Sequence, residues 1–286
     1  TFNQKIKAGS GNITLREDSA SGTVVENFGI GSSVTIAGNE LSFTPTSNLS
    51  ETKNYYLSYP SGVITNMAGE SYVGTAYTFK AITYTYEAWV WGQSTDGQLG
   101  LNNTATRYSS PVQLPGSWQK AQAGHGRSFF VKSDGTLWGV GFNDHGCLGQ
   151  NNAHPAGYVS SPIQVGSDTT WSTSGRTLVS SFNYANTAAI KTDGTLWMWG
   201  KNIGGALGQN NVVHYSSPVQ IPGTTWSTIS GHSTYVATKT DGTMWSWGYN
   251  VRGLLAQNTA YPGTARSSPV QIPGTTWSDA FIDSYH

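Results

Sequence analysis

Apolar and polar residues alternate with a period of two in many short segments of this chain. Because successive side chains of a strand point to opposite faces, this period predicts half-buried β-strands. No segment has the apolar stripe of an amphipathic α-helix. We therefore predict an antiparallel β-sandwich for residues 1–84, with a hairpin turn at Ala-Gly-Asn. The predicted strands of this region are residues 13–16, 23–26, 33–36, 41–43, 55–58 and 76–79.

The remainder of the chain repeats one segment. Asp-Gly-Thr-Leu-Trp-Met-Trp-Gly at residues 193–200 returns at 241–248 and, more diverged, at 134–141, whereas residues 89–92 hold only Trp-Val-Trp-Gly. Asp-Gly between two apolar runs signals a tight two-residue hairpin turn with positive φ. The Trp-x-Trp alternation places both indoles on one side of a strand. Each copy is therefore predicted to be a hairpin that leads into a strand with large core side chains.

Further motifs recur in register with these segments. The glycines that end the Trp-rich strands stand at 92, 141, 200 and 248, and Gly-x-Leu-Gly, Ser-Ser-Pro and a later Trp follow in turn. A repeat of about 50 residues with several short strands suits a propeller blade. We expect a partial β-propeller of about four blades over residues 85–286, with units that start near 88, 137, 196 and 244.

The repeats resemble those of the regulator of chromosome condensation family. The shared pattern is Trp-x-Trp-Gly-x-Asn-x-x-Gly-x-Leu-Gly, then Ser-Ser-Pro-Val-Gln, a Trp, and Asp-Gly-Thr-Leu-Trp, and it covers nearly all of residues 88–286. The resemblance implies a β-propeller, which in that family has seven blades. Here three full units precede a fourth that stops at His286, before its own Asp-Gly-Thr. We expect the gene to continue with such a segment.

Residues 1–84 are similar to the bacterial immunoglobulin-like domain of S-layer and large surface proteins. The matching segments are Phe-x-x-x-Ile-x-Ala-Gly-x-Gly-Asn-Ile-Thr-Leu at 2–15, Val-Thr-Ile at 34–36 and Gly-Val-Ile-Thr-Asn-Met-Ala-Gly at 62–69. The resemblance implies an immunoglobulin-like spacer without catalytic residues. Members of that family have another strand before the position of Phe2, so we expect the sandwich to be incomplete and to be preceded by further sequence.

Composition narrows the classes of partner. The chain has 15 basic and 15 acidic side chains among 286 residues, and charged residues make up only 10%. A neutral, charge-poor chain has no electrostatic footprint for nucleic acid or an anionic membrane. Its single cysteine excludes an internal disulfide framework, and no apolar run is long enough to insert into a membrane. We expect neither a nucleic-acid partner nor membrane insertion.

No catalytic, metal or cofactor motif emerges. The Asp of each Asp-Gly-Thr is explained by turn chemistry, because Asp bonds its own backbone in turns. The six histidines lack metal-ligand spacing. Cys147 stands where other repeats have Gln, Ala or Leu, so it is interpreted as a packed residue. The Trp-x-Trp pairs could form sugar-stacking platforms, but repetition at strand positions favours packing between blades.

Candidate binding residues lie in the loops between Gly-x-Leu-Gly and Ser-Ser-Pro. These loops vary in length while the flanking motifs hold their spacing, and a propeller would place equivalent loops on one surface. Solvated connections, or packing against another chain of the same assembly, are the alternatives. The predicted binding residues are Arg107, Tyr108, His154, Tyr158, His214, Tyr215, Tyr261 and Arg266.

The combination suggests a non-enzymatic, structural and adhesive segment of an extracellular fibre. It resembles marine bacteriophage structural proteins and bacterial surface adhesins, which implies a location on a virion or a bacterial cell surface. The implied partners are other copies or chains of the same assembly and a host-surface protein or glycan. Two alternatives remain. One is a protein-binding propeller that acts as a secreted inhibitor or as a GTPase- or chromatin-type regulator; the other is a carbohydrate-active enzyme, which needs paired carboxylates across a cleft.

Overall fold

A computed structural model describes most of the chain, and it divides into two compact units, residues 1–84 and 85–286. Both units consist of β-strands, as predicted, and the helical segments among the described residues are short 3₁₀ turns. The described residues are 2–47, 49–50, 53–72, 77–80, 86–104, 107–152, 157–180, 185–250, 253–258 and 264–282.

The first unit is an antiparallel, immunoglobulin-like β-structure. Its largest sheet has the order β3-β2-β6-β8, and the pairs β1-β7 and β4-β5 complete it. The core confirms the predicted alternation, because Ile13 and Leu15 of β2 are fully buried and pack with Phe28 of the neighbouring strand β3. The strands are β1 (Ile6–Ala8), β2 (Asn12–Glu17), β3 (Val24–Gly29), β4 (Thr35–Ala37), β5 (Glu40–Ser42), β6 (Asn54–Ser58), β7 (Ile64–Asn66) and β8 (Tyr77–Lys80).

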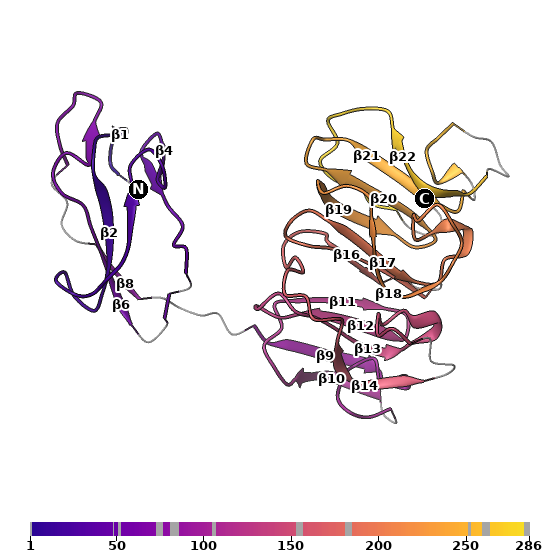
Figure 1. Cartoon of the computed structure of the whole chain (residues 1–286). Helices are drawn as coiled ribbons and strands as arrows, with labels where there is room; N and C mark the ends of the chain where they lie inside the picture. The colour runs from indigo at the N-terminus through magenta and orange to yellow at the C-terminus, as the bar shows by residue number, and fades with distance from the viewer. Residues whose placement is uncertain are drawn as a thin grey trace. The chain divides into compact units, whose positions relative to one another are not determined.

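The second unit stacks four sheets one after another (Figure 1). The first sheet has two described strands, β9 (Ala88–Gln93) and β10 (Arg107–Leu114), and the other three have four strands each. The second sheet contains β11 (Lys120–Gly124), β12 (Arg127–Val131), β13 (Leu137–Phe142) and β14 (Tyr158–Gln164). The third contains β15 (Leu178–Ser180), β16 (Asn186–Ile190), β17 (Leu196–Gly200) and β18 (Tyr215–Ile221). The fourth contains β19 (Trp226–Gly231), β20 (Thr234–Lys239), β21 (Met244–Gly248) and β22 (Arg266–Ile272).

Sequence repeats and sheets are offset by two strands. The Trp-rich strands β9, β13, β17 and β21 begin at residues 88, 137, 196 and 244, where the sequence units begin. Nevertheless, β13, β17 and β21 are each the third strand of a complete sheet. In the first sheet, β9 pairs with β10, which corresponds to the fourth strand of the other sheets. One sequence unit therefore supplies the last two strands of one sheet and the first two of the next, so a unit is not one blade. The unit covalently links neighbouring sheets.

The Asp-Gly-Thr segments form the predicted hairpins, but with a longer turn than two residues. In the third sheet, Lys191 N–H donates to Thr195 O at 2.9 Å and Gly194 N–H donates to Lys191 O at 3.0 Å. Positive φ falls on Gly194 alone (77°), as in a three-residue loop that ends in a left-handed residue. Asp193 Oδ1 accepts from Thr195 N–H at 2.9 Å and from its hydroxyl at 2.7 Å. The Asp is thus a turn residue, as predicted.

Ser-Ser-Pro occupies a bulge in the fourth strand of each sheet. In the third sheet the pairing jumps from Met198–Val219 to Gly200–Tyr215, which leaves the extra residues of β18 out of register. The same shift occurs in the other three sheets. Pro cannot donate to a ladder and is tolerated at bulges and edge strands. The recurrent Ser-Ser-Pro therefore marks where the edge strand bends.

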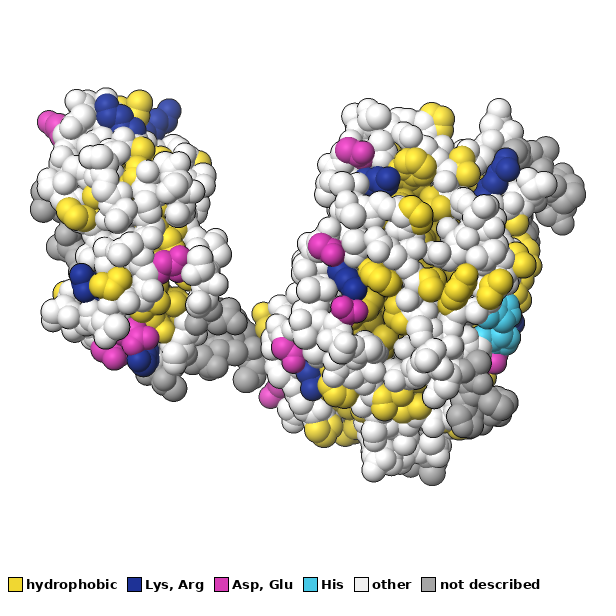
Figure 2. Space-filling view, viewed as in Figure 1, with side chains coloured by type: hydrophobic (Ala, Val, Ile, Leu, Met, Phe, Trp, Pro, Cys, Tyr) yellow, Lys and Arg dark blue, Asp and Glu magenta, His cyan; other side chains and the backbone are white. Residues whose placement is uncertain are grey.

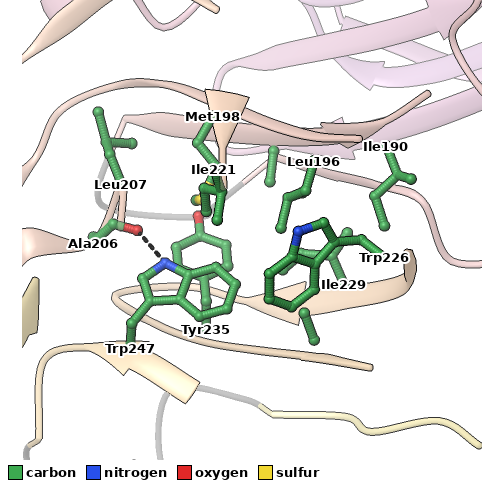
Figure 3. Packing of buried hydrophobic residues seen from close by; sticks show 12 residues of the cluster. Ile190, Leu196, Met198, Ala206, Leu207, Ile221, Trp226, Ile229, Tyr235 and Trp247 are labelled. Carbon is green, nitrogen blue, oxygen red and sulfur yellow. Dashed lines mark hydrogen bonds between the residues drawn. The ribbon is translucent and has the colours of Figure 1, made fainter. Parts of the chain in front are cut away.

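The second Trp of Trp-x-Trp forms the core between successive sheets, which confirms the packing interpretation for Trp199 and Trp247. Both side chains are fully buried. Figure 3 shows Trp247 of the fourth sheet beside Tyr235, with its Nε1–H donating to Ala206 O, which precedes the third sheet's last strand, at 2.9 Å. Trp199 donates in the same way to Cys147 O at 2.8 Å. The third and fourth sheets therefore each bury this indole against the preceding sheet, whereas the second sheet has the buried Val140 at the same position.

The first Trp-x-Trp copy departs from this prediction. Trp89 and Trp91 are 50% and 61% exposed. They belong to the first sheet, and no sheet precedes it among the described residues of the second unit. The exposure of Trp91 follows from this packing, because the second indole of the pair needs the preceding sheet as its cover.

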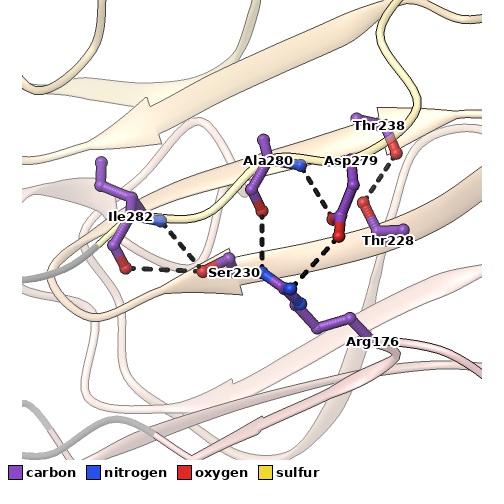
Figure 4. A network of polar contacts seen from close by, with 7 residues as sticks. All are labelled: Arg176, Thr228, Ser230, Thr238, Asp279, Ala280 and Ile282. Carbon is purple, nitrogen blue, oxygen red and sulfur yellow. Dashed lines mark hydrogen bonds and ion pairs between the residues drawn. The ribbon is translucent and has the colours of Figure 1, made fainter.

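At the other end, the segment after Trp277 forms polar contacts with β19 of the fourth sheet and with Arg176, which precedes β15 of the third (Figure 4). Ile282 N–H donates to Ser230 Oγ at 3.2 Å, and the Arg176 guanidinium pairs with Asp279 at 3.2 Å. Trp277 and Phe281 remain 40% and 76% exposed.

Candidate functional site

The structure describes six of the eight predicted binding residues. Of these six, only His214 lies in a loop, because the edge strands β10, β14, β18 and β22 begin earlier than predicted and include the other five. Arg107, Tyr158, His214 and Arg266 have exposed side chains. Tyr108 and Tyr215 are half-buried. His154 and Tyr261 lie outside the described residues.

The loops that carry these residues share one side of the second unit. In each complete sheet the Asp-Gly-Thr turn precedes the first residue of the third strand, and the connection that contains the candidate loop follows its last residue. A strand separates its two ends by about 3.3 Å per residue, so turn and loop lie at opposite ends. Because the stacked sheets repeat this order, the ends of the candidate loops that enter the fourth strands lie at the opposite ends of the sheets from the Asp-Gly-Thr turns.

A buried Asn organises the start of the loops that follow β13, β17 and β21, whereas the loop after β9 has Ser94 at this position. Asn143 and Asn202 follow the third strand and are 3% and 0% exposed. Asn202 Oδ1 accepts from Leu207 N–H at 2.8 Å, and its amide donates to Asn211 O at 3.0 Å. Asn143 makes the equivalent bond to Leu148 N–H at 2.9 Å. The buried amide thereby closes the Gly-x-Leu-Gly segment into a fixed loop base.

A second Asn, just after Gly-x-Leu-Gly, fastens each loop to the following sheet. Asn102, Asn151 and Asn210 all have φ of +57°, a conformation that Asn tolerates better than most residues. No local sequence pattern indicates this role, because the partners lie about 60 residues away. Their N–H groups donate to Ser160, Ser216 and Ser267 carbonyls at 2.8, 2.8 and 2.7 Å, and their Oδ1 atoms accept from Ser161, Ser217 and Ser268 hydroxyls at 3.1, 3.2 and 3.3 Å.

The two half-buried tyrosines are engaged within the loops. Tyr108 Oη accepts from the Asn103 amide at 2.9 Å, and Tyr215 Oη accepts from the Asn211 amide at 3.0 Å. Both hydroxyls help to hold the loop, and each ring offers only part of its surface. The exposed candidates are better placed to contact a ligand.

Two histidines from neighbouring sheets meet beside the loops. The rings of His145 and His214 lie 4.9 Å apart, edge to face. Asn202 N–H donates to His214 Nδ1 at 3.0 Å, so this nitrogen is unprotonated. Burial, followed by the neighbouring His145 and Lys201, lowers the pKa of His214 below its ordinary value, while Asp144 acts in the opposite direction.

The lowered pKa of His214 predicts a loss of stability in acid. The unfolded chain then takes up a proton more readily than the folded chain, so stability falls as pH drops below the ordinary His value of about 6.5. We expect the melting temperature to fall less between about pH 7.5 and pH 5.5 in His214→Asn, which keeps an acceptor for Asn202, than in the parent chain. An equal fall in both proteins, measured by circular dichroism, would contradict this assignment.

The other candidate chemical groups are structural or dispersed. Cys147 is fully buried, and burial raises the pKa of its thiol. Within the described ranges, no three His, Cys, Asp or Glu side chains are grouped so that they could hold a metal ion. The described part of the chain also contains no helix that is long and apolar enough to cross a membrane.

Comparison with known protein families gives a match for each of the two units. The model of the regulator of chromosome condensation (RCC1) repeat matches residues 87–131 and 193–237, and that of a bacterial Ig-like domain matches residues 1–86. Human probable E3 ubiquitin-protein ligase HERC4 is 27% identical over 149 residues, which are 51% of this chain and 13% of HERC4. The rat protein of the same name is 26% identical over the same length.

Solved structures share the fold. Human WBSCR16 aligns with a TM-score of 0.55 and 19% identity over 87% of this chain and 63% of its own. Prp20p from Saccharomyces cerevisiae aligns with a TM-score of 0.53 and 13% identity over 95% of this chain and 62% of its own. This chain thus spans under two thirds of these structures. It contains RCC1 repeats that fold as sheets of a β-propeller, after an N-terminal bacterial immunoglobulin-like domain.

Proposed function

We propose that this chain is a non-enzymatic, adhesive and structural segment of a larger extracellular assembly, such as a virion fibre or a bacterial surface protein. The immunoglobulin-like domain, of a bacterial type, would act as a spacer. The RCC1-type propeller, a protein-binding fold, would present its loops to a host-surface protein or glycan, and other copies or chains of the assembly would be further partners. The neutral, charge-poor composition supports an exterior role without nucleic acid.

The observation that carries this proposal is the way the loops are held. Their bases are fixed by buried Asn side chains, and a second Asn fastens each loop to the next sheet. Rigid bases reduce the conformational entropy that binding must overcome. The exposed side chains beside these loops are those of His214 and of Arg107, Tyr158 and Arg266, which begin β10, β14 and β22. Arg and Tyr are enriched in binding interfaces.

The non-enzymatic part of the proposal rests on how acidic groups are distributed. The Asp of each Asp-Gly-Thr bonds the Thr of its own turn, and each turn belongs to a different sheet. Paired carboxylates across one cleft would be needed for glycoside hydrolysis. The turns distribute these carboxylates along the stack of sheets instead.

The loop surface can be tested with two matched variants. In the first, Tyr158→Ala and His214→Ala remove exposed side chains, one at the start of β14 and one in the loop before β18. In the second, Asp134→Ala and Asp241→Ala change turns at the opposite ends of the strands. Fluorescently labelled chains are applied to a glycan array and to a panel of bacterial cells. We expect the parent and the turn variant to bind alike and the loop variant to bind at least about tenfold more weakly, a loss of about 1.4 kcal/mol or more.

Equal binding by all three chains, with unchanged circular dichroism, would remove recognition from these loops. Capture of a small GTPase in a pulldown, with no binding to glycans or cells, would replace adhesion with a regulatory function. Hydrolysis of an array glycan would contradict the non-enzymatic assignment.

A further inference from the structure

Each complete sheet holds one lysine against two indoles. The lysine lies two residues before Asp-Gly-Thr, and its partners are the first Trp of Trp-x-Trp and the Trp that follows Ser-Ser-Pro. A cation over an indole is attracted by the ring quadrupole. The Nζ-to-centroid distances are 4.1 and 5.1 Å for Lys132 over Trp138 and Trp118, 4.1 and 5.0 Å for Lys191 over Trp197 and Trp171, and 4.5 and 4.7 Å for Lys239 over Trp245 and Trp226.

Two of these lysines line equivalent pockets. A pocket of about 430 Å³ between the first and second sheets contains Lys132, and one of about 380 Å³ between the third and fourth contains Lys239. These volumes are in the range of small-ligand sites. Figure 2 shows Lys or Arg side chains at successive heights on the second unit, each beside hydrophobic side chains.

The walls of the two pockets match position by position. Each has two indoles and two prolines, which are Pro115 and Pro162 in one and Pro222 and Pro269 in the other. Each also includes the loop-fastening Asn, whose Oδ1 is used by a Ser hydroxyl while its amide remains a possible donor. The pockets thus combine apolar walls, an ammonium and an amide.

The lysine between the second and third sheets already has an acidic partner. Lys191 Nζ lies 3.1 Å from Asp168 Oδ2, and the lysine side chain is only 8% exposed. Asp168 belongs to the connection that ends at Trp171, seven residues after Gln164. In the neighbouring repeats, Trp118 follows Gln113 by only five residues and Trp226 follows Gln220 by six. The longer connection therefore supplies a carboxylate that the other two pockets do not receive.

Lys132 and Lys239 have no carboxylate within ion-pair distance in the part of the chain that the structure describes. Each lysine does interact electrostatically with the Asp of its own turn. The pKa values of Asp134 and Asp241 are lowered, mainly by bonds to Thr136 and Thr243 and less by the lysine. Those carboxylates are committed to their turns, so an incoming carboxylate has no such competitor for direct contact with the ammonium.

We propose that the Lys132 and Lys239 pockets each bind an Asp or Glu side chain of a partner protein, as Asp168 occupies the ammonium in the middle copy. A side-chain carboxylate on a loop is the occupant that this chain itself shows. The lysines also cover indole surface that a sugar ring would need for stacking. The pocket walls share the loop-fastening Asn with the proposed adhesive surface but contain none of Arg107, Tyr158, His214 and Arg266, so the two proposals can be tested with different substitutions.

The probe is a synthetic peptide of residues 164–172, which contains Asp168, with a second peptide carrying Asp168→Asn as its control. The readout is the indole N–H signals of Trp138, Trp197 and Trp245 in the ¹⁵N-labelled full chain, each assigned with a Trp→Phe variant. We expect the acidic peptide to shift the Trp138 and Trp245 signals with saturation, and the Asn peptide to shift them at least about tenfold more weakly.

Variants of the full chain assign each shift to a pocket. Lys132→Gln should abolish the shift of Trp138 alone, and Lys239→Gln that of Trp245 alone. Asp168→Ala frees Lys191 and should add a saturable shift of Trp197. The loop variant with Tyr158→Ala and His214→Ala should retain all shifts, which separates this test from that of adhesion.

Absence of shifts at Trp138 and Trp245, or equal shifts with both peptides, would overturn the proposal. Retained shifts in the two Lys→Gln variants would do the same. Saturable shifts with sialyllactose or glucuronate, but not with the acidic peptide, would make the pockets sites for acidic sugars and would equally contradict a protein side chain as ligand.

Discussion

Trp247→Ala should lower the free energy of unfolding of the second unit by about 3–5 kcal/mol, the usual cost of replacing a buried large aromatic with Ala. The side chain is fully buried, and its ring stacks on Tyr235 at 5.8 Å. Its indole N–H also donates to Ala206 O at 2.9 Å. The substitution therefore leaves a cavity between two sheets and an unpaired buried carbonyl. Urea unfolding followed by circular dichroism measures the loss.

The chain contains a matched control for this substitution. Trp91 stands at the equivalent position of the first sheet and is 61% exposed. Trp91→Ala should change stability by about 0.5 kcal/mol or less, as is usual for surface positions. If both substitutions destabilised the chain equally, burial against the preceding sheet would not be the source of the effect.

Gly200→Ala should destabilise the third sheet by at least about 3 kcal/mol, among the larger effects of single substitutions. Gly200 ends β17 with φ of +97°, a conformation that L residues rarely adopt. A Cβ atom there would lie 2.2 Å from Ala185 O and 2.9 Å from Asn186 Cα, both of them backbone atoms. The neighbouring strand would have to move, and the buried Asn186 side chain with it. Thermal unfolding by circular dichroism is the measurement.

Gly92 separates the two contributions. It has nearly the same φ, +101°, at the end of β9, but a Cβ atom there would meet nothing within 4 Å. Gly92→Ala should therefore cost only the backbone strain, about 1–3 kcal/mol. A loss as large for Gly92→Ala as for Gly200→Ala would show that the clash adds nothing.

The strands and most of the core could be predicted because they depend on local patterns. Alternation placed Ile13 and Leu15 in the core of the first unit, and repetition placed Trp199 and Trp247 between sheets. Both patterns are visible in a single chain, because side-chain direction alternates along any strand. The predicted turn length was wrong by one residue, because the number of residues in a hairpin loop depends on which backbone hydrogen bond closes it.

The contacts within the loops and pockets could not be predicted in the same way. Asn102 fastens its loop to a sheet about 60 residues later, and no local pattern identifies such a partner. Tyr108 has a typical binding-loop sequence context, yet its hydroxyl is occupied by Asn103. The role of Lys132 is not visible in the sequence, because one lysine before a turn is ordinary and only the fold brings two indoles to it. The exposure of Trp91 depends on which sheets surround it.

The two-strand offset between sequence units and sheets has a consequence for how such a chain can change length. Recombination between two Asp-Gly-Thr-Leu-Trp segments removes or adds whole sequence units. Because every unit begins at the same point within a sheet, the new junction again joins two strands of one unit to two of another. The interior of the array then gains or loses one complete four-stranded sheet, and no unpaired strand edge is created there. Genes of this type can therefore vary in repeat number while each product keeps intact interior sheets, with any mismatch confined to the two ends of the stack.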